Sequence, residues 1–248
     1  MKLNNPALST KVLEQFGRPG QVSAGEAMTV EGTINKSAFL LLLVVVPATW
    51  VWGQVMRGSV DTAMPWMLGG VFGGFVTALV TIFKKEWSPI TAPIYAALEG
   101  LAIGGLSAIL EAQYHGIVLQ AVGLTFGTLL CMLVAYRIGL IKVTDKFRMI
   151  VVGATGAIAL MYLVTLGLAF FGITVPFIHE SGTAGIIVSL VIVAVAALNL
   201  ALDFDFIDQA VGVGAPKYVE WYAAFGLMVT LIWLYLEILR LLGKVRRR

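Results

Sequence analysis

Seven long apolar stretches constrain what this chain can fold into more than any other feature. A helix needs about 17–25 mostly apolar residues to cross the hydrocarbon core of a bilayer, and each stretch meets that length. Short polar connections separate the stretches, so we expect one compact bundle. The predicted fold class is an all-α integral membrane protein, a seven-transmembrane-helix bundle. The predicted spans are Ser37–Gln54, Met64–Phe83, Ile90–Leu110, Gly116–Tyr136, Met149–Phe171, Ala184–Leu202 (continuing to about Ile207) and Trp221–Leu242.

The composition supports the same class. Of the 248 residues, 59% are hydrophobic and 12% are charged, whereas a soluble domain carries about 25% charged residues. The net charge is only +3 and the basic residues are spread over loops, so no nucleic-acid partner is expected. The single cysteine, Cys131, can form no intrachain disulfide, and we expect a buried, inert thiol.

Two regions follow from the order of these stretches. Residues 1–36 are polar and mixed in charge, and they predict a flexible cytoplasmic arm. Residues 37–248 predict one transmembrane domain. No apolar region with a cleavage site opens the chain, so the first span is expected to be an uncleaved anchor.

The distribution of Lys and Arg predicts the orientation. Eleven fall on the side of the amino-terminal arm and six on the other side, so the amino terminus is expected in the cytoplasm. Five of the six opposing residues lie at the carboxyl end, between Arg240 and Arg248. Either this tail is exported or the last segment re-enters the membrane, and both alternatives stay open here.

Small residues at four-residue spacing predict close helix packing. Pro47 and Pro93 lie inside apolar stretches and are expected to kink or interrupt their helices. The glycine pairs with this four-residue spacing are Gly69/Gly73, Gly70/Gly74, Gly100/Gly104 and Gly123/Gly127.

The sixth stretch ends in the most informative polar cluster of the chain. Asp203, Asp205 and Asp208 follow an apolar run that begins at Ala184. A carboxylate at the membrane centre costs roughly 2.5–3.5 kcal/mol on insertion scales, so such groups usually serve a function. Asn199 and Asp203 are four residues apart and share a helix face, while Asp205 points about 200° away from Asp203. Asp203 is therefore the expected interior group, and Asp205 and Asp208 are expected at a solvated helix end.

Three further acids in or beside the spans are considered. Glu99 is mid-span, and it is expected either to be protonated and bonded to a backbone carbonyl or to face the same cavity as Asp203. Glu220 begins the last span, three residues after Lys217. A third, Glu237, precedes Arg240 by three residues, which predicts a local ion pair.

Enzymatic chemistry is not expected. The chain has no H-E-x-x-H, G-x-S-x-G, Walker or C-x-x-C motif, and its membrane-embedded aspartates share one helix. We therefore predict no enzyme activity and no cofactor.

Five motifs carry a resemblance that extends over all seven spans. Together they resemble the Bax inhibitor family of membrane proteins, also called transmembrane Bax-inhibitor-motif proteins, in its longer bacterial branch. The motifs are Gly32–Lys36, Tyr95–Gly100, Val143–Arg148, Ala197–Ile207 and Glu220–Gly226.

The resemblance implies a seven-helix fold with the last helix at its centre, in a bacterial inner membrane. It also implies a pH-sensitive calcium leak, with an aspartate pair on the last two helices as proton sensor. The sixth-helix aspartate matches Asp203, but Thr230 stands at the partner position. Glu220 and Glu99 are then the two candidates for the second carboxylate of the sensor, in place of the missing aspartate.

The predicted function is thus a pH-sensitive cation (calcium) leak channel, gated by protonation of the sixth-helix aspartate. The predicted ion- and proton-sensing residues are Asp203, Asp205, Glu99, Glu220 and Asn199, with transient calcium at Asp203. The expected partners are the lipid bilayer, calcium or other cations, and a membrane protein. The alternative is a non-conducting regulator that binds a membrane protease or other membrane proteins through the arm.

Overall fold

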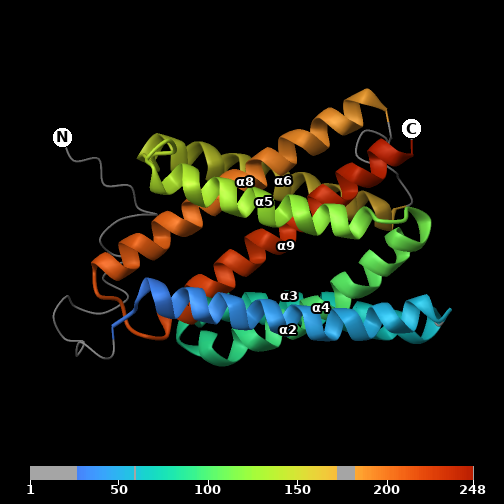
Figure 1. The fold of residues 1–248 in the computed structure, drawn as a ribbon, viewed down its shortest axis with the longest axis horizontal. Helices are drawn as coiled ribbons and strands as arrows, with labels where there is room; N and C mark the ends of the chain where they lie inside the picture. The colour runs from blue at the N-terminus through green and yellow to red at the C-terminus, as the bar shows by residue number, and fades with distance from the viewer. Residues whose placement is uncertain (1–26, 59, 172–181, 248) are drawn as a thin grey trace. The chain divides into compact units, whose positions relative to one another are not determined.

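The computed structural model describes residues 27–58, 60–171 and 182–247, and every element of regular structure in these ranges is helical (Figure 1). Seven helices are long and apolar enough to cross a membrane, which confirms the predicted fold class. A short 3₁₀ helix, Lys85–Trp87, precedes α4. The long helices are α2 (Val30–Met56), α3 (Val60–Phe83), α4 (Ser88–Gln113), α5 (Ile117–Arg137), α6 (Asp145–Phe170), α8 (Thr183–Gly212) and α9 (Val219–Arg246).

The helices are longer than the predicted spans because polar caps extend them beyond the apolar core. Helix α2 begins at Val30 rather than Ser37, where the Thr29 hydroxyl accepts a hydrogen bond from the Gly32 amide at 2.9 Å. Helix α6 begins at Asp145 in the same way, with the Thr144 hydroxyl accepting a hydrogen bond from the Phe147 amide. Part of the predicted arm, residues 30–36, is therefore helical, and residues 1–26 of the arm lie outside the described residues.

The chain forms two compact units. The first unit contains α2, α3, α4 as far as Ala108, and the segment Asp205–Met228 that joins α8 to α9. The second unit contains residues Ile109–Phe204 and Val229–Arg248. Helices α8 and α9 each contribute to both units.

Glycine pairs determine how the helices of the first unit pack. A Cβ atom on Gly100 would lie 2.3 Å from the Val44 carbonyl oxygen, and one on Gly104 would lie 2.3 Å from the Ala48 carbonyl oxygen. The backbones of α2 and α4 therefore touch at these two glycines, as the spacing predicted. Helix α2 continues through Pro47 and α4 through Pro93 without an interruption.

The pair Gly123/Gly127 does not pack in this way. A Cβ atom on either glycine would meet no other atom within 4 Å. Both residues lie on an exposed face of α5, and Cys131 on the same helix is also exposed, so the expected buried thiol is wrong. The apolar composition of α5 fits lipid as well as it fits a neighbouring helix.

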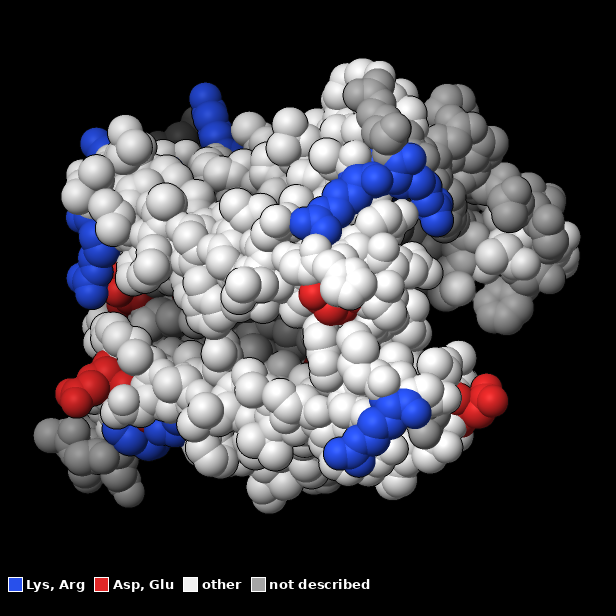
Figure 2. All heavy atoms as spheres, turned by 45° about the vertical axis from the view of Figure 1, so that its right-hand side comes forward, with Lys and Arg blue, Asp and Glu red and all other residues white. Residues whose placement is uncertain are grey.

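Charged side chains are sparse on the face drawn in Figure 2, where residues without charge cover most of the surface. Large apolar side chains are exposed along the spans, among them Phe72, Leu119 and Leu163. Soluble proteins rarely expose continuous apolar surface of this kind, so it indicates contact with lipid.

Helix α9 bears on the two alternatives for the basic tail. It runs without a break for 28 residues, about 42 Å at 1.5 Å per residue, so its described residues contain no re-entrant turn. Thr29 contacts Glu220 at the start of α9, whereas Lys244 and Arg246 lie in its last turn. The beginning of α2 and the basic tail are therefore at opposite ends of α9.

Candidate ion and proton site

Asp203 lies on α8 among buried apolar neighbours, including Leu200 and Phe204. Its carboxylate is hydrogen-bonded to the side chain of Thr230 on α9. The oxygen Oδ2 is buried and has no hydrogen-bond partner among the described residues. A buried carboxylate oxygen without a partner is rare, because removing it from water costs free energy that nothing repays.

Asn199 extends this polar face by one turn of α8. Its Nδ2 donates to the Thr155 hydroxyl oxygen on α6 at 2.8 Å and to the Val195 carbonyl oxygen at 2.9 Å. We call Thr155, Asn199, Asp203 and Thr230 the polar core of the second unit. It combines one carboxylate with neutral amide and hydroxyl groups.

Asp205 and Asp208 belong to other faces of α8, in agreement with the helical spacing. Asp205 Oδ2 accepts a hydrogen bond from Gln209 Nε2 at 2.6 Å, one turn later on the same helix. Asp208 is exposed. Neither residue is placed in the polar core.

Glu99 lies on α4 within the first unit. Its carboxyl is hydrogen-bonded to the side chain of Tyr95, one turn earlier, instead of to the backbone carbonyl that one expectation named. Gly74 of α3 makes room for it, since a Cβ atom there would lie 3.0 Å from Glu99 Oε1. The Tyr95 ring in turn packs edge-on against Phe225, with ring centroids 5.0 Å apart.

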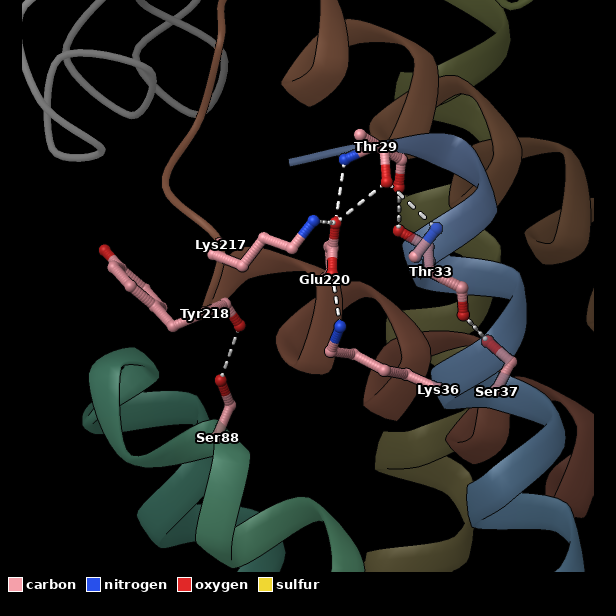
Figure 3. A network of polar contacts seen from close by, with 9 residues as sticks. Thr29, Thr33, Lys36, Ser37, Ser88, Lys217, Tyr218 and Glu220 are labelled. Carbon is pink, nitrogen blue, oxygen red and sulfur yellow. Dashed lines mark hydrogen bonds and ion pairs between the residues drawn. The ribbon is translucent and has the colours of Figure 1, made fainter. Parts of the chain in front are cut away.

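Glu220 is fully buried and surrounded by donors (Figure 3). Its Oε1 accepts hydrogen bonds from the Thr29 amide at 2.9 Å and the Thr29 hydroxyl at 3.0 Å, and Lys217 Nζ lies 2.8 Å away. Lys36 Nζ pairs with Oε2. A carboxylate with two cations and two further donors favours a structural role over the predicted ion- or proton-sensing role.

Backbone hydrogen bonds also attach the residues before α2 to the connection between α8 and α9. The Met28 amide donates to the Ala215 carbonyl oxygen at 2.7 Å, and Ala27 forms an isolated β-bridge with Pro216. Ser88 at the start of α4 donates to the Tyr218 carbonyl oxygen at 3.0 Å. The connection between α8 and α9 is thus attached to both α2 and α4 (Figure 3).

A second polar group in the second unit contains Glu237, Arg240 and Tyr162. Arg240 Nη1 lies 2.9 Å from Glu237 Oε1, which confirms the predicted ion pair. The Tyr162 hydroxyl donates to Glu237 Oε1 at 2.6 Å, so α6 joins the pair. Lys244, one turn after Arg240, donates to the Gly185 carbonyl oxygen and the Ser189 hydroxyl.

Sequence reasoning missed Thr155, Thr29, Tyr162 and Lys244. The spacing of Glu237, Arg240 and Lys244 on one side of α9 was the available signal for Lys244. Thr29 was also visible as a cap that precedes an acidic first turn. Thr155 had no local signal, because a threonine in a span usually bonds its own helix backbone.

The ranges 27–58, 60–171 and 182–247 contain no cluster of metal-binding side chains. Nowhere in these ranges do three or more His, Cys, Asp or Glu side chains lie close enough together to bind one metal ion. The carboxylates described above have their own separate partners: Asp203 with Thr230, Glu99 with Tyr95, and Glu220 with two lysines.

The fold and these buried polar groups define a multi-pass helical membrane protein. The family model described as Bax inhibitor 1 like matches residues 5–247, nearly the whole chain. The chain therefore belongs to this family, which confirms the resemblance carried by the five motifs. Searches of curated proteins and of solved structures gave no match.

Proposed function

We propose that this chain is a pH-sensitive cation leak channel of a bacterial inner membrane, with Asp203 as its gate. The observation that carries the proposal is the buried Asp203 Oδ2, which has no partner among the described residues, next to the interaction of the same carboxylate with Thr230. Calcium is proposed as the permeant ion because the resemblance of the five motifs to the Bax inhibitor family implies a calcium leak. The proposed orientation has the amino-terminal arm in the cytoplasm.

The gate follows from the charge of one carboxyl group. Protonated Asp203 is neutral and can remain packed between α8 and α9. Loss of the proton leaves a buried anion, which is costly without water or a counter-ion, effectively several kcal/mol per ion. Water and cations then enter, the contact between Asp203 and Thr230 opens, and cations pass. Flux is therefore low at acid pH and rises as the pH increases.

Calcium flux into liposomes that contain the purified protein tests this gate between pH 6 and pH 8. Asp203→Asn imitates the protonated, neutral side chain, so we expect its flux to stay at the acid level of the wild type and to lose its pH dependence. Asp208→Asn is the matched control on the same helix, because Asp208 is exposed. It is expected to keep the wild-type profile. Equal flux in wild type and Asp203→Asn across this range would remove Asp203 as the gate.

The attachment of residues 27–36 to the start of α9 favours the alternative function, a regulator that binds a membrane protease or another membrane protein through the arm. A partner that pulls on the arm would act first on Met28 and Thr29, which bond Ala215 and Glu220. Deletion of residues 2–26 should abolish such regulation, and a non-conducting regulator should show no ion flux with or without these residues. The channel predicts instead a flux that depends on Asp203 and persists without residues 2–26.

A further inference from the structure

The polar core of the second unit contains one carboxylate where a two-carboxylate sensor would have two. Thr230 contributes a hydroxyl from α9, Thr155 a hydroxyl from α6, and Asn199 an amide from α8. Within the polar core, therefore, only Asp203 carries a full charge when it is deprotonated. Its free oxygen, Oδ2, is buried.

The other titratable groups on the surrounding helices have their own partners or lie elsewhere. On α9, Glu237 is paired with Arg240 and is seven residues, about 10 Å, beyond Thr230. On α6, Tyr162 is bonded to that same pair. On α5, Tyr136 places its ring against Phe204, with centroids 5.8 Å apart.

On α8 itself, Asp205 points about 200° away from Asp203 and is bonded to Gln209. Asp208 is exposed. The hydrogen bond to Thr230 is the one side-chain interaction that accompanies the burial of Asp203 in the described structure. No lysine or arginine side chain of the described residues neutralises it.

We propose that deprotonated Asp203 binds one monovalent cation of the sodium class, in exchange with the proton, and that calcium does not reside there. The cation site itself does not depend on the proposed function. Only the expected shift in the pH midpoint of the gate rests on it. The cation would contact Oδ2, and the interaction of Thr230 with the same carboxylate would help to orient it.

Charge decides between the two ions. A proton or a monovalent cation neutralises a single carboxylate, whereas calcium would leave one uncompensated positive charge in a buried site. Calcium sites also usually bring 6–8 oxygen ligands, several of them from carboxylates. The polar core offers one carboxylate, and no cluster of three acidic or metal-binding side chains is found in the described residues.

Competition at one oxygen has a measurable consequence. Because sodium and the proton exclude each other from Asp203, each weakens the binding of the other. Above the sodium dissociation constant, a tenfold increase in sodium should lower the pH midpoint of the gate by about one unit, with the slope of a single proton. Calcium at equal ionic strength should leave the midpoint unchanged.

Thermal unfolding of the full-length protein in detergent tests the site without any flux measurement. At pH 8, replacing choline chloride by sodium chloride should raise the Tm by about 2–4 °C, since an ion that binds only the folded state stabilises it. At pH 5 the effect should vanish, and in Asp203→Asn it should vanish at both pH values. Calcium chloride at the same ionic strength should give no rise beyond choline.

Thr230 supplies the variants that keep the test decisive if Asp203→Asn does not fold. Thr230→Val keeps the shape and removes the hydroxyl, so it should weaken the sodium effect. Thr230→Asp adds a second carboxylate, so it should change the preference from sodium to calcium. A wild-type Tm that does not respond to sodium at pH 8, or that responds more strongly to calcium, would overturn the assignment.

The two proposals fail in different ways. Liposomes without any flux, together with a sodium-dependent Tm that requires Asp203, would reject the leak channel and support the cation site. A pH-gated flux whose midpoint does not move with sodium, together with a Tm indifferent to sodium, would reject the monovalent site and leave the channel standing.

Discussion

Gly104→Ala is expected to destabilise the protein by about 3 kcal/mol or to prevent folding altogether. A Cβ atom there would lie 2.3 Å from the Ala48 carbonyl oxygen and 2.5 Å from Ala48 Cα. Both are backbone atoms of α2, so no rotation of a side chain can relieve the clash. Overpacking of a well-packed interior typically costs 1–3 kcal/mol, and more when the backbone must move. Thermal or denaturant unfolding in detergent measures the change.

Two other glycines are matched controls. Gly123→Ala meets no atom within 4 Å, so it should be neutral or stabilise α5 by up to about 1 kcal/mol, because alanine is the better helix former. Gly105→Ala would meet the Met67 side chain, which is flexible and can move, so an intermediate loss is expected. If Gly104→Ala and Gly123→Ala were equally stable, the close contact of α2 with α4 would be refuted.

The same glycines show how far the sequence predicts this fold. Spacing alone identified both Gly100/Gly104 and Gly123/Gly127, but only the first pair packs against a neighbouring helix. Inside a membrane the hydrophobic effect does not distinguish lipid from protein, because both are apolar. Small residues therefore reveal that close packing is possible on a helix face, and the tertiary structure decides whether a neighbour uses it.

The acids show a similar division. The face shared by Asn199 and Asp203 and the pair of Glu237 with Arg240 follow from helical periodicity, which is local information. The partners of Glu220 do not, since Thr29 and Lys36 precede it by 191 and 184 residues. Lys217 was the one neighbour visible at short range. The position of Glu220 at the start of a span was visible in the sequence, and its long-range contacts favour an anchoring role over the predicted sensing role.

Glu220→Gln is expected to cost about 2–4 kcal/mol of stability. The substitution keeps the size of the side chain but removes the charge that Lys36 and Lys217 share. Loss of one partner of a buried ion pair typically costs 3–5 kcal/mol, because the other charge remains without compensation. The two lysines are partly exposed, with side-chain exposures of 18% for Lys36 and 49% for Lys217, so water recovers part of that loss.

The exposures also predict an order among the variants. Lys36→Met should cost more than Lys217→Met, since an exposed ion pair contributes only about 0.2–1 kcal/mol. Glu31→Gln is the matched control, the same chemical change on an exposed residue in the first turn of α2, and it should cost less than about 1 kcal/mol. Denaturant unfolding of the four variants in one detergent gives the series.

If Glu220→Gln lost no more stability than Glu31→Gln, the Glu220 carboxylate would not hold α2 to the connection between α8 and α9. The backbone bond from Met28 to Ala215 would then carry the attachment by itself.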